Sequence, residues 1–219
     1  MTAPATRIVL VRHGEAQSHV DQVVGGMKGC TGLSELGRRQ AAALRDRLET
    51  SGELAGAHLL YASTLPRAVE TAEIIAPALG VPAVACDEEL CELRPGDADG
   101  LTWEEFRARY RWPDGADESF YRPMAPGAET WAGFSTRVGA ALHRLAGLHA
   151  GATVVVACHG GVIEQSFRAL GLLSLAPQFN LRIDNTSLTE WARGAGPDDR
   201  LWTLARFNDA AHLAGLGTR

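Results

Sequence analysis

The chain has 219 residues, of which 46% are hydrophobic, and it carries a formal net charge of −5 at pH 7. This length fits one α/β domain, and the acidic balance argues against nucleic acid or an anionic membrane surface as a partner. The apolar run near the N-terminus is too short for a signal peptide, and no stretch is long enough to span a bilayer. We therefore expect a cytoplasmic protein with no membrane partner.

The cysteines give no sign of a metal or redox motif. Cys30, Cys86, Cys91 and Cys158 form no Cys-x-x-Cys pair, which argues against a zinc ribbon or a thioredoxin-type site. Reduced thiols in a cytoplasmic protein are the expected state.

Apolar periodicity predicts strands and helices that alternate along the chain. In the first half, strands are expected at about 7–12, 58–62 and 82–86, a loop at 16–32, and helices at about 35–50 and from Pro66 onward. In the second half, helices are expected at about 102–110, 130–149 and 161–170, and strands at about 153–158, 183–191 and 201–207. This order predicts an α/β fold in a single domain over 1–219. The expected architecture is a three-layer sandwich, with a mostly parallel central sheet flanked by helices and an inserted cap-like excursion at about 94–126.

Two of the predicted strands end in a histidine followed by a glycine. The first strand leads into Arg12, His13 and Gly14, and a late strand leads into His159 and Gly160. Ligands of open α/β sheets bind at the carboxyl ends of the strands. If the two strands are neighbours, both imidazoles face one site, and we expect that site to hold a phosphoryl group that one histidine attacks.

A further cation lies at a predicted helix start. Arg67 follows Pro66 in the first turn, where free backbone N–H groups favour an anion. On its own, Arg67 would be interpreted as a solvated surface residue. Beside two histidine-glycine strand ends, phosphate contact is the favoured interpretation.

With these motifs in this order, the sequence resembles the histidine phosphatase superfamily, which has the phosphoglycerate-mutase-like fold, from about Arg7 to the last strand. The resemblance implies that His13 is the nucleophile and that an acid protonates the leaving group. Glu92 matches that acid best, and Glu88 and Glu89 are its rivals.

The same resemblance implies the groups that bind the phosphate. They are Arg12, Arg67 and a protonated His159, with Gly14 and Gly160 beside them. The family has an asparagine six residues after the nucleophile, where this chain has a histidine. We expect its neutral imidazole to donate to phosphate in the same way; this residue is His19.

The predicted chemistry needs no metal and no cofactor, because arginines supply the positive charge. A phosphomonoester is dianionic, and a neutral imidazole attacks it without charge repulsion to form a covalent phosphohistidine. Glu92 is expected to be protonated when the leaving group departs, and then to deprotonate the water that hydrolyses phosphohistidine.

The excursion at about 94–126 is rich in arginine and aromatic side chains and is expected to cover the site and select the substrate. A solubilising surface insertion explains it equally well. Its arginines are Arg94, Arg107, Arg109, Arg111 and Arg122. Farther along, Asn185-Thr186-Ser187 resembles a polar element that the family has near the end of the sheet, and we expect only a minor role for it.

Four alternative functions compete with this prediction. A metal hydrolase with His13, His159 and Glu92 as ligands is disfavoured by the nearby arginines. A cysteine phosphatase needs an arginine six positions after a cysteine, and those positions hold Leu36, Glu92, Asp97 and Glu164. A non-catalytic phospholigand-binding module and a phosphoglycerate-mutase-type phosphotransferase stay open.

Hydrolysis of a small phosphorylated metabolite is favoured over the mutase. The Arg-His-Tyr-Gly run of phosphoglycerate mutases is replaced here by Leu93-Arg94-Pro95-Gly96, which lacks the tyrosine. The expected partner is the small phosphorylated substrate, and the sequence leaves open whether the chain forms a homodimer.

Overall fold

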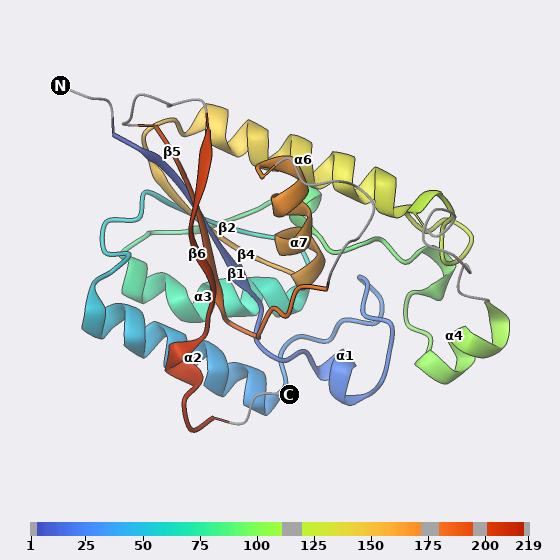
Figure 1. The fold of residues 1–219 in the computed structure, drawn as a ribbon. Coiled ribbons are helices and arrows are strands. Elements are labelled where there is room, and N and C mark those ends of the chain that lie inside the picture. The colour runs from blue at the N-terminus through green and yellow to red at the C-terminus, as the bar shows by residue number, and fades with distance from the viewer. Residues whose placement is uncertain (1–3, 111–119, 172–179, 195–200, 217–219) are drawn as a thin grey trace.

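The computed structural model describes residues 4–110, 120–171, 180–194 and 201–216. In these ranges six strands form one sheet in the order β3-β2-β4-β1-β5-β6 (Figure 1). The strands are β1 (Thr6–Arg12), β2 (Leu59–Ala62), β3 (Val84–Cys86), β4 (Thr153–Cys158), β5 (Leu188–Arg193) and β6 (Trp202–Asp209). The first four run parallel, and β5 and β6 are antiparallel to their neighbours. The predicted α/β fold with a mostly parallel sheet is confirmed.

Helices cover both faces of this sheet. In Figure 1, α2 and α3 lie on one side and α6 and α7 on the other, while α4 stands apart from the sheet. The helices are α1 (Gln17–Val20), α2 (Glu35–Ser51), α3 (Pro66–Leu79), α4 (Trp103–Arg109), α6 (Trp131–Leu148) and α7 (Gly160–Ala169). Short 3₁₀ turns are η1 (Glu88–Leu90), η2 (Gly96–Ala98) and η3 (Ala211–Leu213).

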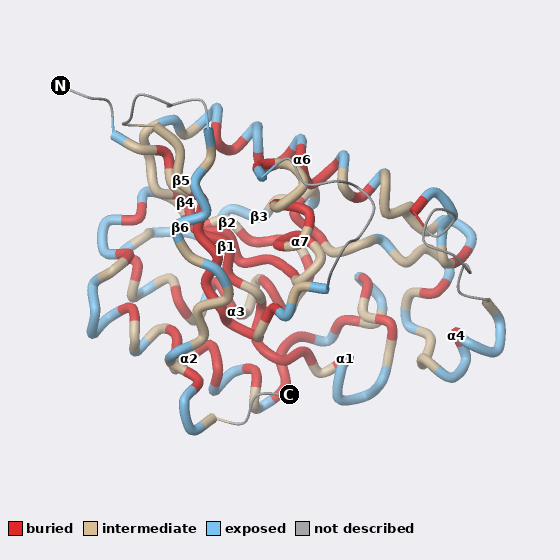
Figure 2. Tube along the Cα trace, in the orientation of Figure 1, coloured by how far each residue is buried: buried red, intermediate tan, exposed pale blue. Residues whose placement is uncertain are grey.

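The central strands are buried on both faces, as their continuous apolar runs predict. Ile8 and Leu10 pack into the core under α6 and α7, whereas Val9 and Val11 pack into the core under α2 and α3. All four side chains are fully buried. Figure 2 shows the buried residues concentrated on these strands. This burial makes the centre of the sheet rigid, so the side chains at the strand ends are held in fixed positions.

β1 and β4 are parallel neighbours, so their carboxyl ends lie at the same edge of the sheet. Arg12 pairs with Cys158 in the register, and the His13 amide donates to the Cys158 carbonyl at 2.9 Å. β2 pairs with β4 on its other side and ends at this edge as well. The topology therefore delivers three consecutive strand ends to one place.

The structure differs from the predicted elements at two points. The predicted loop at 16–32 contains the single turn α1. The strand predicted from Ile183 begins only at Leu188, because the preceding residues fold back onto the end of β1, where the Thr186 amide donates to the Arg12 carbonyl at 2.8 Å.

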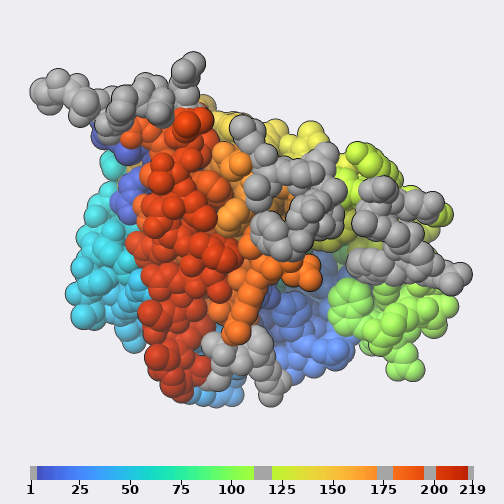
Figure 3. All heavy atoms as spheres, in the orientation of Figure 1, coloured from blue at the N-terminus to red at the C-terminus, as the bar shows by residue number. Residues whose placement is uncertain are grey.

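The excursion at about 94–126 contains η2 and α4 in its described part. Its role as a cap stays a prediction, and Arg111 lies outside the described residues. Figure 3 shows β6, in red, running along the visible face of the molecule. No helix in the described ranges is both long enough and apolar enough to cross a membrane.

Candidate active site

The two imidazoles predicted to converge lie together at the ends of β1 and β4. The ring centroids of His13 and His159 are 5.1 Å apart, with the ring planes at 60°. Both residues are buried, with 3% and 0% of their surface exposed. The separation is short enough for both rings to contact one tetrahedral anion.

The hydrogen bonds of His13 define which of its nitrogens can attack. Nδ1 lies 2.6 Å from the Gly14 carbonyl oxygen. Because a carbonyl oxygen only accepts, Nδ1 carries the proton and Nε2 keeps its lone pair. Arg67 Nε donates to that Nε2 at 3.0 Å, which agrees with the same tautomer. The bond to the Gly14 backbone therefore leaves Nε2 as the nucleophilic atom.

The surroundings of His13 keep its ring neutral. Burial lowers the pKa of His13 well below its ordinary value, and the charges of Arg67, His159 and Arg12 lower it further. A neutral imidazole is what attack on a phosphomonoester requires.

The buried surroundings of His159 affect its protonation. Burial lowers the pKa of His159 well below its ordinary value, and the guanidiniums of Arg67, Arg12 and Arg137 add to that effect. This direction favours a neutral ring in the protein without substrate, and protonation of His159 beside a bound phosphoryl group stays a prediction. Its Nε2 lies 2.6 Å from the Ser63 hydroxyl, and its buried Nδ1 has no partner among the described residues.

Two guanidiniums flank the imidazoles. Arg67 is 5% exposed in the first turn of α3 and donates from Nη1 to the Gly25 carbonyl at 2.7 Å. Arg12 donates from Nη1 to the Ile183 carbonyl, and its buried Nε has no described partner. Burial lowers the pKa of Arg12, an effect that the charge of Glu92 opposes. Both guanidiniums thus lie at the imidazoles, and their contact with a bound anion stays a prediction.

Glu92 is held against the start of α7. Its Oε2 accepts from the Gly161 amide at 2.9 Å, and its Oε1 accepts from the Leu93 amide at 3.0 Å. A Cβ on Gly161 would lie 2.1 Å from Glu92 Oε1 and 2.9 Å from Phe134 Cε1. Only glycine therefore allows the carboxylate this position. The rival Glu89 instead pairs with Arg94 at 3.1 Å.

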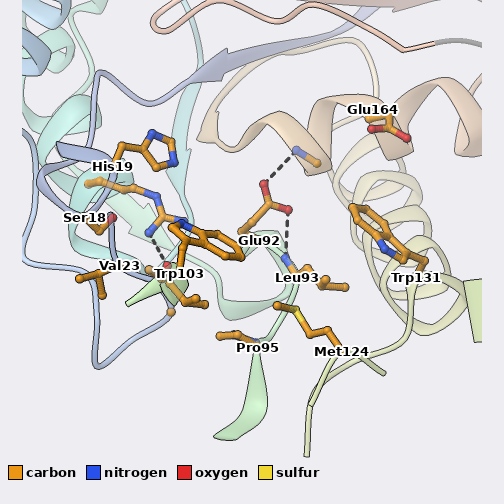
Figure 4. A pocket seen from close by; sticks show the side chains of 15 residues that line it. Ser18, His19, Val23, Glu92, Leu93, Pro95, Trp103, Met124, Trp131 and Glu164 are labelled. Carbon is orange, nitrogen blue, oxygen red and sulfur yellow. Dashed lines mark hydrogen bonds between the residues drawn. The ribbon is translucent and has the colours of Figure 1, made fainter. Parts of the chain in front are cut away.

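Arg67 and Glu92 line a cavity of about 280 Å³, whereas His13, His159 and Arg12 are not among its described lining residues. Figure 4 shows its lining side chains, with Glu92 near the centre of the view and His19 to one side. His19 lies 6.2 Å from His13 between ring centroids. Burial lowers the pKa of His19, and Arg12 and Arg67 lower it further, which favours the neutral ring that we expected. The lining residues are Ser18, His19, Val23, Val24, Gly25, Gly26, Arg67, Glu92, Leu93, Pro95, Trp103, Met124, Trp131, Gly161 and Glu164.

The two site glycines have different roles. The amide of Gly14 donates to Thr71 Oγ1 at 3.1 Å, and a Cβ there would lie 2.4 Å from the Gly37 carbonyl oxygen. Gly14 is thus required for packing against α2, and the prediction that it binds phosphate is wrong for its amide. Gly160 begins α7, with Arg12 Nε 3.8 Å from where its Cβ would be.

Sequence reasoning missed Ser63 and underrated Asn185. Ser63 follows β2 directly, so the rule that ligands bind at strand ends was the available signal. Asn185 Nδ2 donates to the His13 carbonyl at 2.9 Å and so supports the backbone of the nucleophile. No pattern in the sequence marks that contact, because the two residues are 172 positions apart.

The arginines of the excursion do not line the main cavity in the described structure. Arg94 lines a neighbouring cavity, and Arg107, Arg109 and Arg122 are exposed on the surface. From this segment Pro95, Trp103 and Met124 line the main cavity instead.

The alternative chemistries gain no support from the described residues. No group of three or more His, Cys, Asp or Glu side chains in that part of the chain is placed to hold a metal ion. The Arg67 guanidinium also faces the His13 nitrogen that a metal would need. Burial raises the pKa of the Cys158 thiol, which opposes a thiolate nucleophile beside the site.

A model of the histidine phosphatase superfamily (branch 1) matches residues 8–210. Phosphoglycerate mutase-like protein 4 of Arabidopsis thaliana is 31% identical over 215 residues, 96% of this chain and 88% of that protein. The metal-independent phosphoserine phosphatase of Arabidopsis thaliana is 29% identical over 217 residues, 97% of this chain and 85% of that protein. A solved mycobacterial glucosyl-3-phosphoglycerate phosphatase has a TM-score of 0.74 at 28% identity and covers 94% of this chain and 99% of its own. Together with two histidines converging at adjacent strand ends, these matches show that the chain belongs to branch 1 of the histidine phosphatase superfamily.

Proposed function

We propose that the chain hydrolyses small phosphomonoesters without a metal ion, through a phosphohistidine formed on His13 Nε2. The observation that carries the proposal is the tautomer of His13, whose Nδ1 is bonded to the Gly14 carbonyl and whose Nε2 faces Arg67. Relatives named as a metal-independent phosphoserine phosphatase and a glucosyl-3-phosphoglycerate phosphatase support hydrolysis of this type.

In the first step the Nε2 lone pair of His13 attacks phosphorus, and the ester P–O bond breaks. Arg67 then donates to a phosphoryl oxygen instead of to Nε2, and Arg12 stabilises the negative charge on the other phosphoryl oxygens. The negative charge that the ester brings favours protonation of His159. Glu92 then gives its proton to the departing alkoxide, which leaves as the alcohol.

In the second step Glu92, now a carboxylate, takes a proton from a water molecule as that water attacks phosphorus. The P–N bond breaks and its electron pair returns to His13 Nε2, so the neutral imidazole is restored. Inorganic phosphate leaves, and Glu92 is again protonated for the next ester. The amides of Gly161 and Leu93 hold the carboxylate in one place through both steps.

A phosphotransferase of the mutase type is the second candidate, because relatives include probable phosphoglycerate mutases of Yersinia species at 29% identity. Assays of p-nitrophenyl phosphate and phosphorylated metabolites in excess EDTA separate the candidates. A hydrolase releases inorganic phosphate with EDTA present, and His13→Ala abolishes this release. Transfer between phosphoglycerates without net phosphate release would favour the mutase, and activity that requires added metal would contradict both.

We also propose that the protein works in the cytoplasm, in agreement with its free cysteines Cys30, Cys86, Cys91 and Cys158. Nucleic acid is not an expected partner for a chain with a net charge of −5.

A further inference from the structure

We propose that the substrate's alcohol carries an uncharged aromatic ring and no carboxylate, and that this ring binds against Trp103 and Trp131. The inference rests on the proposed function, since it names the substrate class of the same site. It concerns the part of the cavity that lies beyond the phosphoryl-binding groups.

The two indoles are fixed before any ligand binds. Trp103 begins α4, where Thr102 and Glu105 form a capping box, and its ring contacts Phe106 edge to face at 5.6 Å. Trp131 begins α6 after the N-cap Thr130, and its ring lies 5.8 Å from that of Phe134. Figure 4 shows both indoles at the cavity with Glu92 between them. Rigid aromatic walls bind a flat ring with little loss of conformational entropy.

The remaining outer wall is apolar. Val23, Val24, Leu93, Pro95 and Met124 complete it. A methionine sulfur favours contact with an aromatic ring. Few polar side chains line the cavity away from Arg67 and Glu92. The hydroxyl groups of a sugar would therefore lose their bound water there without gaining enough hydrogen bonds.

The charge of the lining opposes a carboxylate on the substrate. Glu92 and Glu164 both line the cavity, and Arg67 is the only lysine or arginine among its described lining residues. Arg67 is committed to the phosphoryl end, where it bonds His13 and Gly25. Because Glu92 acts as the acid while the ester is bound, a phosphoglycerate or phosphoserine carboxylate would meet the charge of Glu164, and the described lining offers it no second lysine or arginine.

Two arginines beside the cavity are held in ion pairs. Arg168 lies 2.8 Å from Glu164 in an ion pair, and Arg94, in the neighbouring cavity, pairs with Glu89. The volume of about 280 Å³ is at the lower end of small-molecule sites. It suits a phosphoryl group and one ring rather than a nucleotide.

The test compares four alkyl phosphates by kcat/KM: benzyl phosphate, 3-phosphoglycerate, glucose 6-phosphate and glycerol 1-phosphate. All four have alkyl leaving groups, so the comparison reports binding of the alcohol rather than its acidity. We expect kcat/KM for benzyl phosphate to exceed that for 3-phosphoglycerate by about tenfold or more. A tenfold ratio corresponds to the free energy of a modest aromatic contact.

Variants of Trp103 and Trp131 test whether these two residues cause the preference for benzyl phosphate. Trp103→Ala and Trp131→Ala should each raise KM for benzyl phosphate about tenfold and raise KM for glycerol 1-phosphate by a clearly smaller factor. A thermal unfolding transition like that of the wild type shows that each variant is folded. Trp103→Phe and Trp131→Phe should retain the preference. Trp202→Ala is the matched control. Trp202 lies in β6, stacks on Arg193 of β5 and does not line the cavity.

A charge variant tests the exclusion of carboxylates. Glu164→Gln should raise kcat/KM for 3-phosphoglycerate roughly threefold, because a like charge is removed and Arg168 loses its ion-pair partner, and should change kcat/KM for benzyl phosphate by a smaller factor. This gain cannot come from misfolding.

The outcomes separate the inference from the proposed function. Preference for 3-phosphoglycerate or glucose 6-phosphate, or tryptophan variants that weaken all four esters equally, would overturn the inference and leave the phosphatase intact. If the wild type hydrolyses none of these esters and no p-nitrophenyl phosphate, the proposed function fails and the inference fails with it.

Discussion

Gly161→Ala is the substitution that most sharply tests how the acid is held. The new Cβ would lie 2.1 Å from Glu92 Oε1, 2.9 Å from Glu92 Cδ and 2.9 Å from Phe134 Cε1. A real Cβ cannot approach an oxygen so closely. Phe134 is fully buried and cannot yield, so the carboxylate must leave its present position. His13, Arg12 and Arg67 are not among the atoms nearest to the added Cβ, so they should keep their places.

The magnitude follows from the role of Glu92. General acid–base catalysis contributes about 10²–10⁴ in rate, so we expect kcat for an alkyl phosphate to fall by about 10² or more. The effect on stability should be small. Overpacking costs about 1–3 kcal/mol, and replacing glycine by alanine inside a helix returns up to about 1 kcal/mol.

The assay uses two esters under the same conditions. With glycerol 1-phosphate the variant should be slow from the first turnover, because the alkoxide must be protonated as it leaves. With p-nitrophenyl phosphate, whose leaving group needs no proton, a rapid burst of about one equivalent of p-nitrophenol should precede slow turnover, since only hydrolysis of phosphohistidine then depends on Glu92.

Gly147→Ala is the matched control, because it lies in α6 with nothing within 4 Å of the added Cβ. It should keep wild-type kcat with both esters. Wild-type kcat in Gly161→Ala, or an equal loss in the control, would refute the idea that this contact positions the acid.

Two further predictions concern the buried histidines. Ser63→Ala should lower kcat about tenfold, because Nε2 of His159 loses its 2.6 Å partner, whereas Ser63→Thr should restore most of the rate; equal losses in both variants would contradict this. The second prediction concerns pH. Burial lowers the pKa of His212 to about 4 and lowers those of His13 and His159 well below the ordinary value of about 6.5 that holds in the unfolded chain. The unfolded chain therefore binds more protons below about pH 6.5, so the free energy of unfolding should be constant above pH 7 and fall as the pH drops towards 5. Urea unfolding midpoints measure this, and a flat profile from pH 8 to 5 would contradict it.

The central residues of the site could be predicted from the sequence because each lies beside a local sequence pattern, either the end of an apolar strand or the start of a helix. Arg12, His13 and His159 end apolar strands, and Arg67 opens a helix after a proline. Each signal lies within a few residues of the side chain that it marks, so the topology rules for parallel sheets place them together.

What the sequence did not predict depends on contacts between distant segments. The fit of Glu92 against Gly161 joins residues 69 positions apart, and the Ser63 bond to His159 joins residues 96 apart. In the sequence, Trp103 and Trp131 resemble ordinary first residues of helices. Only the structure shows that both line the cavity. β5 begins late because Arg12 and His13 hold residues 183–187 in a turn, a tertiary constraint that overrides their strand propensity.

The central claim is that His13 carries the phosphoryl group during turnover. The most direct measurement is mass spectrometry of the protein after rapid mixing with p-nitrophenyl phosphate and quenching at alkaline pH. The account predicts one added phosphoryl group on the peptide that contains His13, more of it in Glu92→Gln than in the wild type, and none in His13→Ala. A phosphoryl group on a different residue, or turnover in His13→Ala at the wild-type rate, would contradict the account.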